Sequence, residues 1–203
     1  MTFRLGLTGS IGMGKSTTSD MFGAEGIPVW DADAVVHKLY QPDGSATALV
    51  ARLFPSAIEN GAVSRPKLRA VLTADPAALD RLQAAIHPLV AADRAGFLAA
   101  QSAPIVLLDI PLLYETGADA ECDAVVVVTA PPEVQRARVL ARGEMTAADF
   151  ELILSRQLPD VEKRAKADYI IATTTLDAAR TAVRHILADI RGKLDHARDR
   201  SGH

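Results

Sequence analysis

A glycine-rich segment near the start of the chain constrains its fold more than any other feature. Residues 9–16 read GSIGMGKS, which matches the pattern G-x-x-x-x-G-K-[ST]. An apolar run at 3–8 precedes this segment and a helical pattern at 15–23 follows it. The chain is therefore expected to begin as a buried strand, a phosphate-binding loop and a helix.

The chemistry of this loop follows from its residue types. Glycines permit tight turns in which successive backbone N–H groups point at phosphate oxygens, and the following helix adds its positive N-terminal end. Lys15 supplies a charge to the outer phosphates, and the Ser16 hydroxyl can bind Mg²⁺. The sequence thus predicts a nucleoside triphosphate site, although the loop alone does not identify the reaction.

Four further short apolar runs predict the remaining strands, at 27–30, 105–108, 124–128 and 169–172. Near-continuous apolar strands that are separated by helices predict a parallel sheet covered on both faces. Asp31 and Asp75 stand where helices are expected to begin and are predicted to cap them. We therefore expect an α/β fold with five parallel strands.

The predicted elements also suggest how the chain is divided. The segment 34–101 is mainly helical and too long for a simple crossover between strands, so we interpret it as an inserted helical subdomain. A second excursion, 141–166, separates the last two strands. The core is then expected at 1–33, 102–140 and 167–192, with a C-terminal tail at 193–203.

Composition excludes several classes of protein. The 203 residues are 49% hydrophobic and 23% charged, which is typical of one globular domain with insertions. The single cysteine excludes an intrachain disulfide, and no apolar run approaches the ~18 residues of a membrane span. A net charge of −3 and 4% aromatic residues argue against a nucleic-acid binder. Because no signal peptide is visible, we expect a cytoplasmic protein.

The loop fits a small kinase better than a GTPase. A GTPase reads guanine with an N-K-x-D segment, but Asn60 is the only asparagine and Gly61 follows it. A kinase needs a carboxylate that orients the acceptor, a carboxylate for Mg²⁺, and cations around the transferred phosphoryl group. The chain offers candidates for each of these roles.

Two segments supply the candidate carboxylates. Asp31 and Asp33 follow the second predicted strand, and one of them can accept the proton of an acceptor hydroxyl. The alternative is that Asp31 caps a helix and Asp33 complements its dipole. Asp109 ends the third strand and can hold Mg²⁺, with a turn-forming aspartate before Pro111 as the alternative.

The candidate cations lie in the segment after the fourth strand. Arg138 and Arg142 are four residues apart and share a helix face. A mobile lid can bring such arginines over the phosphates, whereas a solvated charged helix is the alternative. His87, in the helical insertion, fits a structural hydrogen bond better than a catalytic role.

Together these features resemble the dephospho-coenzyme A kinase family. The matching segments, in the family's order, are Leu7–Thr17, Asp31–Asp33, His87–Pro88, Asp109–Glu115, Ala130–Gln135, Arg156–Gln157 and Lys163–Asp168. Very many proteins share the phosphate loop, but its combination with DAD and DIPLLYE is much more specific. One departure follows the fifth strand, where the family often has Asp-Asn or Asn-Asn and this chain has Ala172 and Thr173.

The resemblance implies an activity and a fold. The activity is transfer of a phosphoryl group from ATP to the ribose 3′-hydroxyl of dephospho-coenzyme A, the last step of coenzyme A synthesis. The implied fold is a three-layer sandwich of the P-loop NTPase type, with a five-stranded parallel sheet, a helical substrate insertion at 34–101 and a small lid at 141–166. Nucleoside monophosphate kinases have a similar core.

The resemblance also implies roles for individual residues. Asp33, Lys15 and Arg142 are the expected catalytic residues, and Ser16 and Asp109 the expected Mg²⁺ ligands. The residues expected to bind ATP are Gly9, Gly12, Met13, Gly14, Lys15, Ser16, Thr17, Arg138 and Arg142. The residues expected to bind the acceptor are Thr8, Asp33, His87, Leu112, Tyr114, Glu115, Arg156 and Arg164.

The expected partners are therefore small molecules. ATP and dephospho-coenzyme A are the substrates and Mg²⁺ the cofactor, with no nucleic-acid or membrane partner and with the chain a monomer or a weak homo-oligomer. Two other functions are kept as alternatives. One is another small-metabolite kinase, such as a nucleoside monophosphate kinase, and the other is a non-catalytic nucleotide-binding protein on the same fold.

Overall fold

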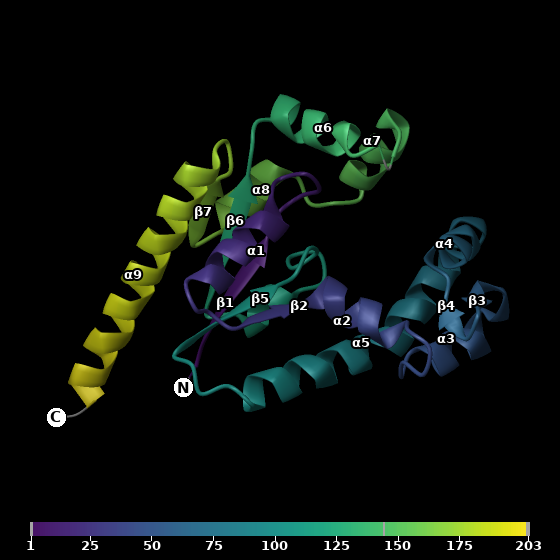
Figure 1. Ribbon diagram of the computed structural model, residues 1–203, viewed down its shortest axis with the longest axis horizontal. Helices are drawn as coiled ribbons and strands as arrows, with labels where there is room; N and C mark the ends of the chain where they lie inside the picture. Colours follow the sequence, from purple (N-terminus) through teal and green to yellow (C-terminus); the bar gives the residue numbers. More distant parts are fainter. Residues whose placement is uncertain (1, 144, 202–203) are drawn as a thin grey trace. The chain divides into compact units, whose positions relative to one another are not determined.

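The computed structural model describes residues 2–143 and 145–201 (Figure 1). The chain divides into two compact units. The first, which we name the phosphate-loop unit, contains the residues up to Trp30 and those from Ser102 onward. The second, the inserted unit, is Asp31–Gln101.

The phosphate-loop unit is built on one sheet whose strand order is β2-β5-β1-β6-β7. These strands are β1 (Phe3–Thr8), β2 (Val29–Asp31), β5 (Ile105–Asp109), β6 (Ala124–Thr129) and β7 (Tyr169–Ala172). The central strand β1 runs parallel to both neighbours, with Leu5 beside Leu107 on one side and Ala124 on the other. The predicted α/β fold with five parallel strands is confirmed.

Apolar side chains at successive strand positions explain why both faces of this sheet are buried. Leu5, Leu7, Leu107 and Val126 belong to one hydrophobic cluster with residues of α1 (Lys15–Ala24) and α9 (Leu176–Ser201). The intervening strand residues, among them Val106, Leu108, Val125 and Val127, are also buried, and α8 (Asp160–Lys166) contacts β6. Between the polar residues at the strand ends, the buried strand positions are therefore apolar on both faces rather than alternating, as expected for a parallel sheet.

The remaining elements of this unit follow β5 and β6. A short 3₁₀ helix, η2 (Ala118–Glu121), leads into β6, and α6 (Pro132–Ala141) and α7 (Ala147–Ser155) come after it. The α7 N-terminus is closed by a capping box in which Thr146 and Asp149 bond reciprocally. An ion pair of 2.6 Å between Arg136 and Glu151 joins α6 to α7.

The inserted unit is mostly helical. Its elements are α2 (Ala32–Leu39), α3 (Thr47–Leu53), η1 (Pro55–Ala57), β3 (Ile58–Glu59), β4 (Ala62–Val63), α4 (Arg65–Ala74) and α5 (Pro76–Ala99). Both predicted caps are confirmed. The Asp31 carboxylate accepts from the backbone N–H groups of Asp33 and Ala34, and Asp75 accepts from that of Ala77.

The prediction of a mainly helical segment at 34–101 did not include one feature, a two-stranded antiparallel hairpin formed by β3 and β4. Asn60 and Gly61 make its turn with φ values of 49° and 77°. A two-residue turn with both residues at positive φ matches the twist of paired strands, and Asn-Gly is its preferred sequence. The Asn-Gly pair is a hairpin signal in the sequence. The flanking strands have only two residues each, too few to show the alternation of apolar and polar residues that identifies a strand.

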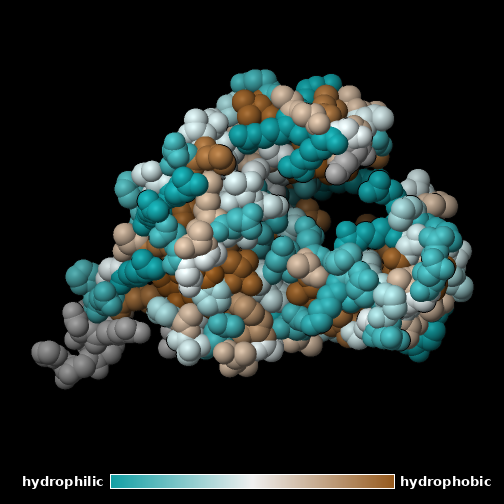
Figure 2. Space-filling view, in the orientation of Figure 1, coloured by the Kyte–Doolittle hydropathy of each residue, from teal (hydrophilic) through white to brown (hydrophobic). Residues whose placement is uncertain are grey.

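Two further observations complete the fold. Helix α9 continues to Ser201, so most of the segment predicted as a tail is helical, and residues 202–203 lie outside the described part. None of the described helices is long and apolar enough to cross a membrane. On the face shown in Figure 2, hydrophobic side chains lie in small groups between hydrophilic ones.

Gly6 allows a test of how tightly β1 packs against Cys122 and Leu113. A Cβ on Gly6 would lie 2.8 Å from both Cys122 Sγ and Leu113 Cδ1. We expect Gly6→Ala to lower the free energy of unfolding by roughly 1–3 kcal/mol through overpacking, measured by urea denaturation. Adding Cys122→Ala should recover part of this loss, because it removes one of the two colliding atoms.

A matched control for that substitution lies in α1. A Cβ on Gly23 would have Val29 Cγ2 as its nearest neighbour at 3.9 Å. Gly23→Ala should therefore stabilise the helix by roughly 0.5–1 kcal/mol. Equal effects of the two glycine substitutions, or strict additivity of Gly6→Ala and Cys122→Ala, would contradict the steric explanation.

Candidate active site

The phosphate loop between β1 and α1 depends on backbone shapes that only glycine adopts easily. Gly12 and Gly14 have φ values of 77° and 88°, in the left-handed region. Gly14 is also the N-cap of α1 and, as a glycine, has no side chain that could cap the N–H groups of the helix. The first N–H groups of a helix have no partner within it, so this end of α1 is suited to an anion.

Lys15 and Asp109, both predicted to serve the triphosphate and its Mg²⁺, are in direct contact. The Lys15 ammonium donates to Asp109 Oδ1 at 2.6 Å, and the two side chains are 13% and 2% exposed. Asp109 is the last residue of β5, which is parallel to β1, so the sheet brings the carboxylate to the phosphate loop. Ser16, next to Lys15, is exposed.

Thr173 holds the second half of the loop and was not predicted as a site residue. Its hydroxyl donates to the carbonyl of Met13 at 2.8 Å, and its backbone carbonyl accepts from Arg138 Nη2 at 2.6 Å. The predicted ATP-binding residue Arg138 thus contacts the segment after β7. A Cβ on Gly14 would lie 3.2 Å from Thr173 Oγ1, so this glycine also permits close packing.

Two glutamines hold the first half of the loop and were also missed. Ile11 donates its backbone N–H to Gln157 Oε1 at 3.0 Å, and its carbonyl accepts from Gln135 Nε2 at 2.7 Å. Both glutamines lie within segments quoted for the family resemblance, but nothing in their pattern predicts contact with the loop. Ser10 was missed as well, and its buried hydroxyl has no hydrogen-bond partner among the described residues.

The segment after β5 carries three predicted acceptor-side residues, and a fourth, Thr8, contacts it from β1. The Thr8 hydroxyl, at the end of β1, donates to the carbonyl of Pro111 at 2.9 Å. Leu112 is exposed, and the buried Tyr114 hydroxyl has no hydrogen-bond partner among the described residues. Burial raises the pKa of Tyr114 to about 12, and the nearby carboxylate of Asp168 adds to this shift. Tyr114 therefore stays protonated and can donate a hydrogen bond.

The carboxylate of Glu115 is engaged by protein groups. Its Oε1 atom accepts from the backbone N–H of Leu158 at 2.9 Å and lies 2.8 Å from Lys163 Nζ. The Lys163 side chain is fully buried. Burial by itself raises the pKa of Glu115, but Lys163 and the Leu158 N–H outweigh it and hold that pKa below its ordinary value of 4.5.

The predicted lid cations differ in their surroundings. Arg142 and Arg156 are exposed residues at the C-terminal ends of α6 and α7. Arg164 pairs with Asp160 at 2.9 Å, and the same carboxylate oxygen accepts from the Thr129 hydroxyl. Arg164 is therefore tied to the end of β6 by way of Asp160.

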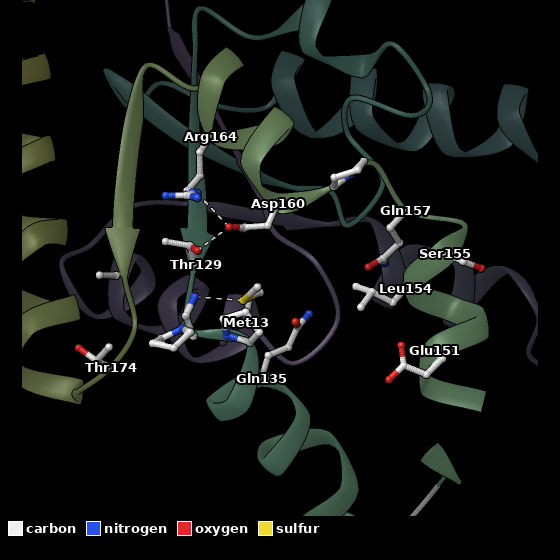
Figure 3. Close-up of a pocket in the computed structure, with 15 residues that line it drawn as sticks. Met13, Thr129, Gln135, Glu151, Leu154, Ser155, Gln157, Asp160, Arg164 and Thr174 are labelled. Carbon is white, nitrogen blue, oxygen red and sulfur yellow. Dashed lines mark hydrogen bonds and ion pairs between the residues drawn. The ribbon is translucent and has the colours of Figure 1, made fainter. Parts of the chain in front are cut away.

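A cavity of about 790 Å³ lies beside the loop, within the phosphate-loop unit (Figure 3). Met13 and Gln135 line it from the loop and α6, and Leu154 lines it from α7. Asp160 and Arg164 approach it from α8. The cavity thus combines an apolar wall with a charged pair at one end.

Two predicted site residues belong to the inserted unit. Asp33 is exposed in the first turn of α2, two residues after the end of β2 along the chain. His87 is exposed on α5, directly before Pro88. The roles expected of both residues stay predictions.

Glu115 gives the protein a testable pH dependence of stability. Because its folded-state pKa lies below 4.5, its contribution to the free energy of unfolding is fully present above pH 4.5 and is lost as the pH falls through the folded-state value. We expect Glu115→Gln/Lys163→Met, which makes both side chains neutral, to lose less stability on this acid limb than the wild type. Urea denaturation between about pH 3 and pH 7 measures the free energy of unfolding of both proteins.

The control for this pH experiment is Glu151→Gln, which removes the partner of Arg136 from an exposed ion pair. Because screened surface pairs contribute about 0–1 kcal/mol, the acid limb of this variant should follow the wild type. An unchanged acid limb in the Glu115 and Lys163 double variant would contradict the assignment to Glu115.

Comparison with known proteins agrees with this geometry. The family model for dephospho-CoA kinase matches residues 3–177. The dephospho-CoA kinase of Cereibacter sphaeroides is 62% identical over 193 residues, covering 95% of this chain and 98% of that protein. The dephospho-CoA kinase of Ruegeria pomeroyi is 55% identical over 197 residues, covering 97% of this chain and 100% of that protein.

A solved structure extends the likeness to three dimensions. The crystal structure of TT1252 from Thermus thermophilus has 32% sequence identity and a TM-score of 0.83, and the match covers 93% of this chain and 97% of that one. The family model, the curated relatives and this structure each span nearly all of the elements that form the site. The chain belongs to the dephospho-CoA kinase family.

Proposed function

We propose that this protein transfers the γ-phosphoryl group of ATP to the ribose 3′-hydroxyl of dephospho-CoA, giving CoA and ADP. Phosphorylation of dephospho-CoA with ATP is the activity of the family to which the chain belongs. The observation that carries the proposal is the contact between Lys15 and Asp109 at the phosphate loop, which joins a phosphate-binding cation to a carboxylate.

The phosphate loop forms the ATP side of the site in this proposal. Backbone N–H groups from Gly12 to Thr17 surround the phosphates, and the Lys15 ammonium neutralises charge on the outer ones. The Ser10 hydroxyl supports this arrangement, since it is buried in the loop and has no hydrogen-bond partner among the described residues. Gly9 keeps the loop close to β6, because a Cβ there would meet Val128.

Mg²⁺ completes the ATP side. Ser16 offers a hydroxyl and Asp109 a carboxylate, and these oxygen donors suit a cation that takes few protein ligands and keeps several waters. When bound, Mg²⁺ would neutralise charge on the β- and γ-phosphates. The contact with Lys15 keeps the Asp109 carboxylate directed at the phosphate loop.

Asp33 is the acceptor-side carboxylate of the proposal. The hydroxyl oxygen forms a bond to the γ-phosphorus while the bond from that phosphorus to the bridging oxygen of ADP breaks. The hydroxyl proton passes to Asp33. Because the transition state is loose, Asp33 serves mainly to orient the hydroxyl and takes the proton late.

The other predicted residues complete the two substrate sites. Arg142, from the lid at 141–166, stabilises the transferring phosphoryl group, while Arg138 supports the ATP side through Thr173. The hydroxyl of Tyr114, which has no hydrogen-bond partner among the described residues, is a donor for the acceptor. The remaining proposed acceptor contacts are Thr8, His87, Leu112, Arg156 and Arg164.

We infer a cytoplasmic enzyme that acts as a monomer or a weak homo-oligomer. The proposed partners of the enzyme are ATP and dephospho-CoA. The proposal includes no nucleic-acid or membrane partner.

The direct test is an ADP-release assay with Mg-ATP and a panel of acceptors. We expect turnover with dephospho-CoA and a product heavier by one phosphate, measured by mass spectrometry. The panel includes nucleoside monophosphates and small alcohols. Turnover only with a nucleoside monophosphate would replace the substrate assignment, and ATP binding without acceptor-dependent ADP release would favour a non-catalytic protein.

Two substitutions separate the roles within the site. Lys15→Ala should lower kcat by roughly 10²-fold or more, because it removes electrostatic stabilisation of the transferred group. Asp33→Asn should keep ATP binding but lose most turnover, since the amide cannot take the proton. Steady-state kinetics and titration with a non-hydrolysable ATP analogue measure the two effects.

The control is Lys193→Met, which removes an exposed ammonium of α9 that pairs with Asp189. Its kcat should match the wild type. Near-normal turnover of purified Asp33→Asn would remove Asp33 from the acceptor role, and a similar result for Lys15→Ala would exclude the proposed phosphate contact.

A further inference from the structure

The apex of the phosphate loop is held by side chains from two distant parts of the chain. Both backbone groups of Ile11 are engaged, the N–H by Gln157 and the carbonyl by Gln135. Gln135 is 4% exposed and extends from α6. Gln157 lies between α7 and α8, and both glutamines face the cavity in Figure 3.

The segment that carries Gln157 is itself held by a carboxylate. Leu158, the next residue, donates its backbone N–H to Glu115 Oε1 at 2.9 Å. Three residues after the end of α7, this bond ties the chain to the segment that follows β5. Gln157 therefore reaches Ile11 from a backbone that Glu115 holds in place.

Lys163 explains why this anchor is firm. Its side chain is fully buried, and its ammonium lies 2.8 Å from the same Glu115 oxygen. A buried ammonium is stable in its charged form only beside a compensating anion, and removal of the anion alone is strongly destabilising. The ion pair thus fixes α8 and the preceding residues relative to Glu115.

The chain of contacts ends at Ile11, close in sequence to the residues that are proposed to bind phosphate. Glu115 lies six residues after Asp109, which accepts from Lys15. Ile11 lies one residue before Gly12, whose φ of 77° sets the turn of the loop. A displacement of Gln157 would therefore release the apex of the loop next to its left-handed turn.

We propose that Glu115, Lys163 and Gln157 are positioning residues that hold the apex of the phosphate loop in its phosphate-binding shape. The ion pair of Glu115 and Lys163 fixes the backbone at Leu158, and Gln157 transmits this constraint to Ile11. Glu115 then acts through the protein rather than by contact with the acceptor. The proposal rests on the proposed function, because it concerns the same phosphate loop.

The first experiment measures ATP-side binding without any acceptor present. Gln157→Met keeps the length of the side chain but removes the oxygen that Ile11 binds. We expect a non-hydrolysable ATP analogue to bind this variant roughly 3- to 10-fold more weakly by calorimetry, as the loss of one net hydrogen bond implies. The KM for dephospho-CoA should stay unchanged.

The second experiment uses a rescue that a direct contact between Glu115 and the acceptor does not predict. Glu115→Gln leaves Lys163 buried and uncompensated, so ATP-analogue affinity and thermal stability should both fall. Adding Lys163→Met removes the buried charge, while the amide oxygen at 115 can still accept from Leu158. Affinity and melting temperature should then return close to the wild-type values. The double variant keeps the test valid if Glu115→Gln alone does not fold.

The control is Glu25→Gln, the same chemical change in an ion pair with Arg184 that joins α1 to α9. Surface pairs contribute little, so its affinity should stay within about twofold of the wild type. Wild-type affinity in Gln157→Met, or a failed rescue with a raised KM for dephospho-CoA in both Glu115 variants, would overturn the positioning proposal. Absence of ATP-analogue binding by the wild type would instead reject the proposed function.

Discussion

The phosphate loop can exist only because three glycines let three different elements approach it. A Cβ on Gly9 would collide with Val128 of β6, one on Gly12 with Val139 of α6, and one on Gly14 would press on Thr173 after β7. The loop is therefore enclosed by the elements that follow it rather than standing free at the end of β1. Its shape is a property of the whole phosphate-loop unit.

The parallel sheet gathers the polar groups of the site. Thr8, Asp109 and Thr129 are the last residues of β1, β5 and β6, and Thr173 follows β7. Each strand is apolar along its buried length and changes to a polar side chain where it leaves the sheet. Because parallel strands end at the same edge, four segments distant in sequence contribute to one site.

The parts of this arrangement that a sequence can reveal are local. The phosphate loop, the five strands and the caps at Asp31 and Asp75 each rest on neighbouring residues, and the structure confirms them. The contacts of Gln135 and Gln157 with Ile11 join residues more than a hundred positions apart. Amide side chains carry no periodic signal, so no pattern could predict those contacts.

Lys163 shows that a sequence also does not reveal which charged side chains are buried. It stands among Arg164 and Lys166 in a stretch whose composition indicates a solvated face, yet its side chain is fully buried. Its environment is decided by Glu115, which is 48 residues earlier in the chain. Charge count alone cannot distinguish a buried lysine from its exposed neighbours, because burial depends on a partner that only the fold supplies.

The place of β1 in the sheet has a consequence for synthesis of the chain. β1 is central in the sheet but precedes its neighbours β5 and β6, which begin at Ile105 and Ala124. Until about a hundred further residues have left the ribosome, this apolar strand has no strand to pair with. The inserted unit is continuous in sequence and can become compact during that interval. The same connectivity that brings the loop to the middle of the sheet therefore delays the nucleotide site until β5, β6 and the segment after β7 have been made.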